Sequence, residues 1–227
     1  MSPRFVAYLV LLFVPAAVQA ADLDEVLASM DEASASFQGL EAKVEWVKYT
    51  ALVDDKNTES GVVAVRRSAD KKVDLKIEFQ EPYPYFLLVR GTKVEIYRPK
   101  IATVEEYDLS KSRDKLEQAL LLGFGASGKF LRERYDIKVL GEESAAGVET
   151  VKLELIPKDE SQRKDIPRID MWVSKANWNP VQQKLHQASG DDYRLYSYSE
   201  IALNPKLSNA AFKLKIPGKT KRVFPQR

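Results

Sequence analysis

The sequence of 227 residues contains no cysteine and only one histidine, His186. The absence of cysteine excludes disulfides, thiolate metal sites and cysteine nucleophiles. It also excludes a lipid-modified N-terminal cysteine, so a role in lipid handling would require a freely diffusing protein. With one histidine and no calcium-loop motif, a metal site would need a cage of carboxylates, and we predict neither a metal nor a cofactor.

Patterns of catalytic residues are also missing from the sequence. His186 lies in a predicted strand on the face opposite Val181 and Leu185, where we expect it to be solvated. No Ser-His-Asp spacing and no pair of carboxylates stands out. The glycines between residues 123 and 128 lack the lysine of a phosphate-binding loop and indicate flexibility only. The chain is therefore not expected to be an enzyme.

No excess of one charge marks the chain as a nucleic-acid-binding protein. Its 35 basic and 33 acidic residues give no electrostatic attraction to a polyanion. Beyond residue 20, apolar residues alternate with charged ones and form no run long enough to span a membrane. With 44% hydrophobic residues, the chain can bury a real core, and we predict one monomeric domain over residues 21–227.

The first twenty residues have the pattern of a secretory signal peptide. Arg4 precedes an apolar run from Phe5 to Val18, and the segment ends at Ala20. The run is short for a membrane span, and the small residue suits a signal peptidase. We predict cleavage after Ala20 and export across the inner membrane into the periplasm. An uncleaved membrane anchor is the alternative.

The rest of the chain is predicted to begin with one amphipathic helix and to continue as strands. Apolar residues recur at helical spacing over about 22–38, and Gly39 ends this pattern. The period then becomes two, most clearly over 73–79, where apolar and charged residues alternate. Further alternating stretches, one of them Phe212 to Ile216, bring the prediction to eleven or twelve strands. Short turns between them indicate an antiparallel meander.

Two segments interrupt the predicted strands. A helical segment between about 110 and 132 carries Leu116, Leu120 and Phe124 on an apolar stripe, and its three glycines favour a mobile lid. The charged stretch 158–165 is predicted to be a long solvated hairpin loop.

The predicted architecture is an unclosed, strongly curved antiparallel β half-barrel of about eleven strands, covered by helical lid segments. Two short helical segments cannot fill the space above so large a sheet, so it either closes into a barrel or encloses an apolar cavity. Patterning alone leaves a simply packed core as the alternative. The cavity is predicted to be lined by Val63, Val65, Leu75, Ile77, Phe79, Val94, Ile96, Leu116, Leu120 and Phe124.

Arg67 breaks the apolar pattern of its strand. Strand alternation places it on the face of Val63 and Val65, whereas Arg66 faces outward. A guanidinium at the end of a dry face must find acceptors, because an unpaired buried charge costs several kcal/mol. Arg67 either bonds to carbonyls of the lid or a ligand head group and so controls closure, or extends outward into solvent at the strand end.

Three stretches resemble the LolA family of periplasmic lipoprotein carriers. Gly61 to Arg67 resembles the family's glycine-initiated strand, which ends in its functional arginine, and Arg67 takes that position. Gly91 to Pro99 is similar to its glycine-led strand with a Tyr-x-Pro ending, and Phe212 to Gly218 is similar to its closing motif. The chain departs from the family at Ser68, where proline is usual, and at Glu95, where an aromatic residue is common.

The resemblance implies a non-enzymatic carrier whose cavity holds the acyl chains of lipoproteins between the inner and outer membranes. Its implied partners are acylated lipoproteins as cargo, an inner-membrane ABC release complex and an outer-membrane receptor lipoprotein. The alternative is the same half-barrel carrying or sensing another lipid, such as a glycolipid or isoprenoid, or an envelope-stress signal.

Overall fold

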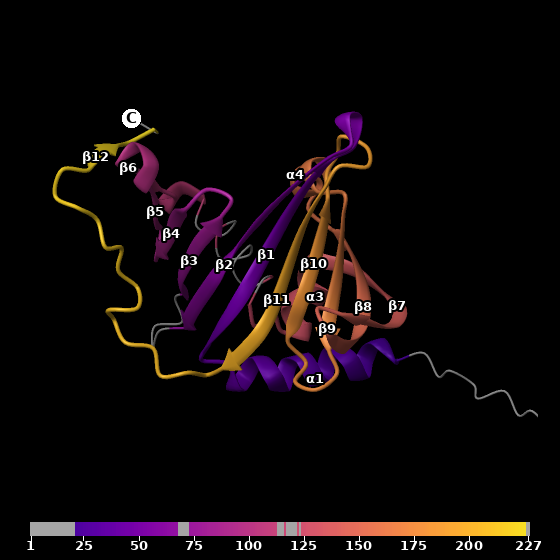
Figure 1. Cartoon of the computed structure of the whole chain (residues 1–227). Helices are drawn as coiled ribbons and strands as arrows, with labels where there is room; N and C mark the ends of the chain where they lie inside the picture. The colour runs from indigo at the N-terminus through magenta and orange to yellow at the C-terminus, as the bar shows by residue number, and fades with distance from the viewer. Residues whose placement is uncertain (1–20, 68–72, 113–115, 117–121, 123, 226–227) are drawn as a thin grey trace, which may run out of the picture.

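The computed structural model describes residues 21–67, 73–112, 116, 122 and 124–225, and its strands form one sheet (Figure 1). The strands are β1 (Gly39–Thr50), β2 (Asp55–Arg67), β3 (Val73–Glu81), β4 (Tyr85–Arg90), β5 (Lys93–Arg98), β6 (Thr103–Asp108), β7 (Tyr135–Ala145), β8 (Val148–Pro157), β9 (Arg168–Ser174), β10 (Pro180–His186), β11 (Tyr193–Leu203) and β12 (Lys221–Val223). The α-helices with described bounds are α1 (Leu23–Ser36), α3 (Gly128–Arg134) and α4 (Glu160–Asp165).

The twelve strands are ordered β12-β6-β5-β4-β3-β2-β1-β11-β10-β9-β8-β7. Strand β1 pairs with β2 on one side and with β11 on the other, which joins the two halves of the chain. Neighbouring strands are antiparallel, except that β12 is parallel to β6. Among the described strands, the outermost two, β12 and β7, do not pair with each other. This arrangement confirms the predicted unclosed half-barrel.

Helix α1 confirms the amphipathic helix predicted over about 22–38. Asp22 caps its first turn, because its carboxylate accepts hydrogen bonds from the backbone N–H groups of Asp24 and Glu25. Val26, Leu27 and Met30 form its buried stripe. The helix lies across one end of the sheet, as Figure 1 shows.

Helix α3 packs against α1 at a glycine. A Cβ on Gly128 would lie 2.1 Å from the backbone oxygen of Leu27, so only glycine permits this approach. Ser127 caps α3 by accepting a hydrogen bond from the backbone N–H of Phe130. Asp31 of α1 accepts another from the N–H of Lys129. The two helices therefore cover the sheet as one unit.

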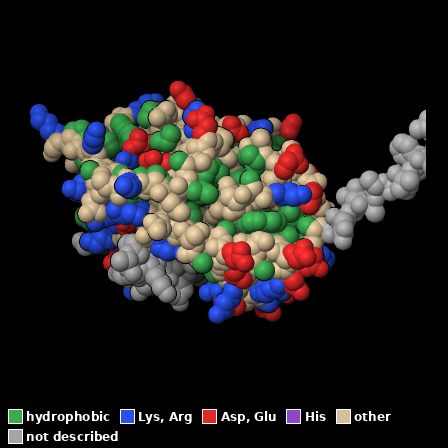
Figure 2. Space-filling model, turned by 90° about the horizontal axis from the view of Figure 1, so that it is seen from below, with side chains coloured by type: hydrophobic (Ala, Val, Ile, Leu, Met, Phe, Trp, Pro, Cys, Tyr) green, Lys and Arg blue, Asp and Glu red, His purple; other side chains and the backbone are tan. Residues whose placement is uncertain are grey.

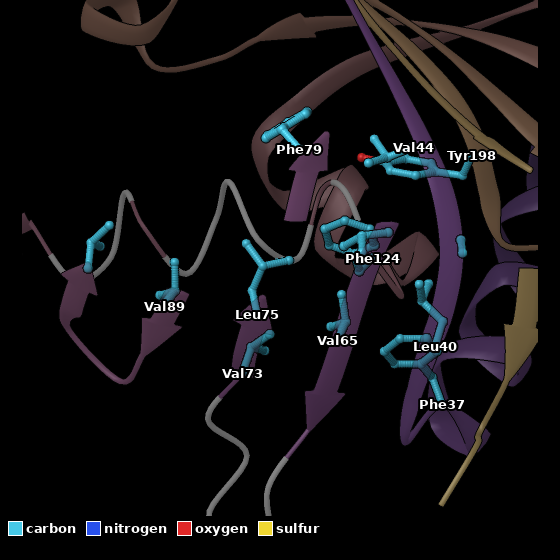
Figure 3. Packing of buried hydrophobic residues seen from close by; sticks show 13 residues of the cluster. Phe37, Leu40, Val44, Val65, Val73, Leu75, Phe79, Val89, Phe124 and Tyr198 are labelled. Carbon is cyan, nitrogen blue, oxygen red and sulfur yellow. The ribbon is translucent and has the colours of Figure 1, made fainter. Parts of the chain in front are cut away.

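The buried hydrophobic residues form two main clusters. The first lies under β1 to β5 and includes Phe37, Leu40, Val65, Leu75 and Phe79 (Figure 3). The second lies between the helices and the other half of the sheet, and its main members are Val26, Leu27, Met30, Leu131, Tyr135, Val151, Leu153, Leu155, Ile169, Met171 and Val173. We call the face of the sheet that carries Leu75 and Tyr198 the inner face.

The prediction of a strand over Phe212 to Ile216 is wrong, because these residues have no regular secondary structure. Phe212 is nevertheless buried, with the Arg66 guanidinium 4.6 Å from its ring centroid. Arg66 belongs to β2, which already pairs with β1 and β3. Since both edges of β2 are occupied, the segment cannot pair with it as a strand. The buried Phe212 ring holds the segment in place instead.

The charged stretch 158–165 connects the antiparallel neighbours β8 and β9 and is mostly exposed, as predicted for a solvated hairpin loop. The loop also contains a helix that was not predicted, α4 (Glu160–Asp165). Asp159 caps it by accepting a hydrogen bond of 2.7 Å from the backbone N–H of Gln162. Glu160 lies in the first turn and basic residues lie in the last, which suits the helix dipole.

Viewed from below, the side on which α1 lies in Figure 1, the surface carries charges of both signs between separate hydrophobic patches (Figure 2). None of the helices in the described part of the chain is both long and apolar enough to cross a membrane.

Candidate functional site

A cavity of about 700 Å³ lies on the inner face of the sheet. Both halves of the sheet contribute to its wall, together with Leu122 and Phe124 from the segment before α3. The apolar and aromatic residues of the wall are Val44, Leu75, Ile77, Phe79, Leu87, Leu122, Phe124, Tyr135, Ile166, Ile169, Leu185, Tyr196 and Tyr198, and Gln183 lies among them. The cavity thus occupies the space between the two hydrophobic clusters.

One side of the cavity is polar. It is formed by the end of α3 and by the connection that contains α4, and its residues are Glu133, Arg134, Lys158, Asp159, Ser161, Gln162 and Asp165. Most of these side chains are exposed to solvent. The charged groups therefore lie at the mouth, and the apolar wall lies inside.

Aromatic rings follow one another across four strands of the inner face. Tyr196 stacks on Trp46 at 5.7 Å between ring centroids, Trp46 contacts Phe79 at 6.0 Å, and Phe79 stacks on Tyr85 at 4.6 Å. Burial raises the pKa of Tyr196 and of Tyr85, and the Tyr85 hydroxyl also donates a hydrogen bond to Glu59. Phe79 and Tyr196 line the cavity, and their contacts with Trp46 and Tyr85 support this part of its wall.

Four of the residues predicted to line the cavity do so: Leu75, Ile77, Phe79 and Phe124. The first three lie on β3, whose alternation made the prediction clearest. Phe124 reaches the cavity from the lid segment and packs against Tyr198, with 5.1 Å between the ring centroids.

Val63, Val65 and Val94 are buried in the first hydrophobic cluster and are not among the residues that line the cavity. Ile96 and Leu116 are partly buried against the same cluster. Phe37 and Leu40 belong to it too and help to fill the space over β2 with side chains. The prediction that these five residues line the cavity is therefore not supported, and Leu120 lies outside the described residues.

Several cavity residues were not predicted. Val44, Ile169 and Leu185 alternate with polar neighbours, which indicates strands but not a place at the cavity. Leu87 stands between Phe86 and Leu88 and has no such pattern. Tyr196 and Tyr198 also alternate and could have been found in this way. Gln183 is buried and bears no such signal, because glutamine in a strand normally marks a solvated face.

A bulge explains why Val181 and Leu185 do not share a face as predicted. The pairing of β9 and β10 shifts between Pro180 and Gln182. Leu185 consequently lines the cavity, whereas Val181 packs with Trp172 in a separate small cluster.

Arg67 is half-buried at the end of β2. Its Nη1 donates a hydrogen bond of 3.1 Å to the backbone carbonyl of Ser34 in α1, and its guanidinium lies 5.4 Å from the ring centroid of Phe37. Burial lowers the pKa of Arg67. The expected bond to a carbonyl of a covering helix is present, but the helix is α1 and not the lid segment.

Two buried hydrogen bonds attach the segment before α3 to its surroundings. The Ser34 hydroxyl donates to the carbonyl of Gly125 at 2.9 Å, and Gln183 Nε2 donates to the carbonyl of Leu122 at 2.7 Å. Arg67 and Gly125 therefore meet at Ser34, one through its carbonyl and the other through its hydroxyl. This places a polar connection from β2 to the lid segment beside the cavity.

His186 is not the solvated residue that was predicted. Its Nε2 lies 3.1 Å from Asp170 Oδ2 and 2.9 Å from Arg168 Nη2, and its side chain is 17% exposed. Cross-strand pairing brings the three residues together, since Arg168 lies opposite His186 on the neighbouring strand. They belong to a partly buried charged group away from the cavity. No cluster of three potential metal ligands occurs among the described residues.

A family model described as "Uncharacterized protein" matches residues 88–210. No curated protein matches the chain. Among solved structures, an uncharacterized conserved protein from Thermus thermophilus is 13% identical, with 88% of this chain and 98% of that chain covered and a TM-score of 0.57. The MucA/MucB complex of Pseudomonas aeruginosa contains a chain that is 14% identical, with 86% and 61% covered and a TM-score of 0.52.

A LolA superfamily protein from Nitrosomonas europaea is also similar, at 14% identity, with 86% and 99% covered and a TM-score of 0.41. At these low identities the similarity extends to the fold alone. The Thermus thermophilus protein and the matched chain of the MucA/MucB complex, whose TM-scores exceed 0.5, share the overall fold of this chain. The chain spans between 61% and 64% of the length of the matched chains in the MucB structures.

Proposed function

We propose that this chain, which belongs to the family of uncharacterized proteins matched over residues 88–210, is a carrier of acyl chains in the bacterial envelope. The observation that carries the proposal is the cavity of about 700 Å³, whose wall is apolar and aromatic. This volume lies within the roughly 300–1,000 Å³ typical of small-molecule pockets.

The physical need for such a carrier follows from the cost of exposing hydrocarbon to water. Each methylene moved out of water gains about 0.8 kcal/mol, so a lipid with long chains leaves a membrane at measurable rates only into another apolar environment. The inner face supplies that environment, and the charged mouth at α3 and α4 suits the polar end of an amphiphile. Binding and release then require no chemistry on the carrier.

The finer assignment is periplasmic transport of lipoproteins between the two membranes after cleavage of the signal peptide at Ala20. Cargo would be received from an ABC release complex and delivered to an outer-membrane receptor lipoprotein. The second candidate is sensing of a lipid or envelope-stress signal through a protein partner. The similarity to a chain of the MucA/MucB complex favours it, since that structure contains two proteins.

Displacement of a fluorescent fatty acid by an acylated peptide tests the carrier function. Ile77→Trp places a larger side chain at the cavity wall and should weaken binding by about tenfold, because the lost contact area corresponds to ~1–2 kcal/mol. Leu140→Trp is the matched control, since Leu140 is half exposed and does not line the cavity. A folded protein that binds no probe, or equal binding by both variants, would contradict the proposal. Native mass spectrometry of protein purified from its own envelope would identify the cargo.

A further inference from the structure

Tyr198 and Gln183 place buried, uncharged polar groups in the largely apolar wall of the cavity. Tyr198 on β11 is 6% exposed, and Gln183 on β10 is 3% exposed. Both line the cavity on the inner face. Polar groups at such depth normally have a hydrogen-bond partner, because burying one without a partner costs about 1–3 kcal/mol.

The Tyr198 hydroxyl has no hydrogen-bond partner among the described residues. Its ring is fixed by Phe124, with centroids 5.1 Å apart, but that contact leaves the oxygen free. In Figure 3 this oxygen points away from β11 in the direction of Phe79. Burial raises the pKa of Tyr198, so the hydroxyl keeps its proton and remains able to donate.

Only the nitrogen of the Gln183 side-chain amide has a hydrogen-bond partner among the described residues. Its Nε2 donates to the Leu122 carbonyl at 2.7 Å, which orients the amide and leaves its oxygen as an acceptor with no described protein donor. Four side-chain atoms in the described part of the chain are fully buried and have no hydrogen-bond partner: Trp46 Nε1, Arg66 Nε, Arg168 Nε and Asp170 Oδ1. The Tyr198 hydroxyl oxygen and the Gln183 amide oxygen are not among these atoms. Both oxygens are therefore accessible from the space inside the cavity.

The two oxygens belong to neighbouring positions of the sheet. Gln183 pairs with Tyr196, and Tyr198 follows two residues later on the same face of β11. The Cα atoms of such diagonal neighbours lie about 7–8 Å apart, so the two side chains border the same stretch of the cavity wall. A donor and an acceptor therefore face the same part of the cavity.

We propose that Tyr198 and Gln183 form a polar subsite that binds a hydroxyl group carried on the acyl chain of the ligand. A hydroxyl accepts from Tyr198 and donates to Gln183, which satisfies both groups at once. An ionised group does not suit this position, because the charged residues that line the cavity belong to its mouth at α3 and α4. The inference rests on the proposed carrier function and specifies its ligand as a hydroxylated chain.

The test compares stearic acid with hydroxystearic acids whose hydroxyl stands at successive positions, titrated calorimetrically into the mature chain. At least one positional isomer should bind about tenfold more tightly than stearic acid, as two neutral hydrogen bonds imply. Tyr198→Phe should remove most of this preference, measured as the ratio of the two affinities within the same variant. Tyr193→Phe is the matched control on the same strand, because Tyr193 does not line the cavity.

The outcomes separate the two proposals. If stearic acid and every hydroxystearic acid bind equally well, the polar subsite is wrong and holds a water molecule only, while the carrier function stands. A preference that persists in Tyr198→Phe overturns the assignment to Tyr198. If the folded wild type binds none of these acids, both proposals fail.

Discussion

Arg67 on β2 donates a hydrogen bond to the backbone carbonyl of Ser34 in α1, with 3.1 Å between Nη1 and the oxygen. Ser34 in turn donates its hydroxyl proton to the carbonyl of Gly125 at 2.9 Å. A strand, the covering helix and the segment that leads into α3 are thereby connected through one serine. If that segment moves away from the cavity, either these hydrogen bonds break or α1 moves with the segment.

Arg67→Leu should therefore stay folded but hand over cargo poorly. The variant loses a hydrogen bond from a charged donor, which corresponds to ~1–2 kcal/mol at a half-buried site, and it adds apolar surface beside the lid. We expect normal uptake of a labelled lipoprotein and slower transfer to the receptor than in the wild type. Urea unfolding measures the loss of stability, and a transfer assay measures the hand-over.

The control for Arg67 is Arg90→Leu, at the exposed end of β4. Arg66 is unsuitable although it precedes Arg67, because it pairs with Asp74 at 2.7 Å and with Asn209 at 2.9 Å. Normal transfer by Arg67→Leu, or equal failure of the Arg67 and Arg90 variants, would show that Arg67 does not control release.

Gly125→Ala should destabilise the protein more than Gly147→Ala. Both glycines have positive φ, +73° and +80°, so both substitutions carry the left-handed penalty of ~1 kcal/mol. A Cβ at Gly125 would also lie 2.7 Å from the Phe37 ring, whereas nothing lies within 4 Å at Gly147. We expect an additional loss of about 1–3 kcal/mol from overpacking, measured by urea unfolding. Equal losses in the two variants would mean that the Phe37 ring moves aside.

Phe212→Ala should release the segment between β11 and β12. Phe212 is 1% exposed and packs against Arg66, and truncating a buried phenylalanine costs ~3–5 kcal/mol. We expect rapid proteolytic cleavage between residues 205 and 220. Phe224→Ala, at a residue that is 40% exposed, should be cleaved at nearly the wild-type rate. Unchanged cleavage of the Phe212 variant would contradict the proposed anchor.

Glu143→Gln should reduce the dependence of stability on acidic pH. The hydrogen bond from the Trp172 indole, followed by Lys152, lowers the pKa of Glu143 below its usual 4.5. This stabilisation is therefore present above about pH 4.5 and is lost as the pH falls through the lower pKa of the folded state. The carboxylate is half exposed, so the effect should be small, about 0.5 kcal/mol.

Urea unfolding of the Glu143 variant at neutral and acidic pH measures this difference. Glu142→Gln controls for the loss of a surface ion pair, here the one with Lys175. If Glu143→Gln loses as much stability as the wild type on acidification, the Trp172 contact does not stabilise the ionised carboxylate.

Much of the fold follows from local patterns. Alternation over 73–79 identifies β3, and Asp22 followed by an apolar stripe identifies α1, because a strand and a helix each expose one face in a characteristic period. Asp159 with Gln162 three residues later is the same kind of capping signal, so α4 could have been predicted. The alternation at Phe212 is misleading, since a strand also needs a free partner edge.

The sequence by itself determined which residues of β3 face inward on the half-barrel, and it excluded disulfides and other cysteine-dependent sites. The tertiary structure alone decided where the inner face is packed and where it is hollow. Val65 and Leu75 are cross-strand partners and have the same alternation, yet only Leu75 lines the cavity. The reason is that alternation reports the direction of a side chain, whereas a cavity depends on what lies opposite it. Phe37 and Leu40 lie where α1 leads into β1. Only the folded structure shows that they pack in the first hydrophobic cluster beside Val65.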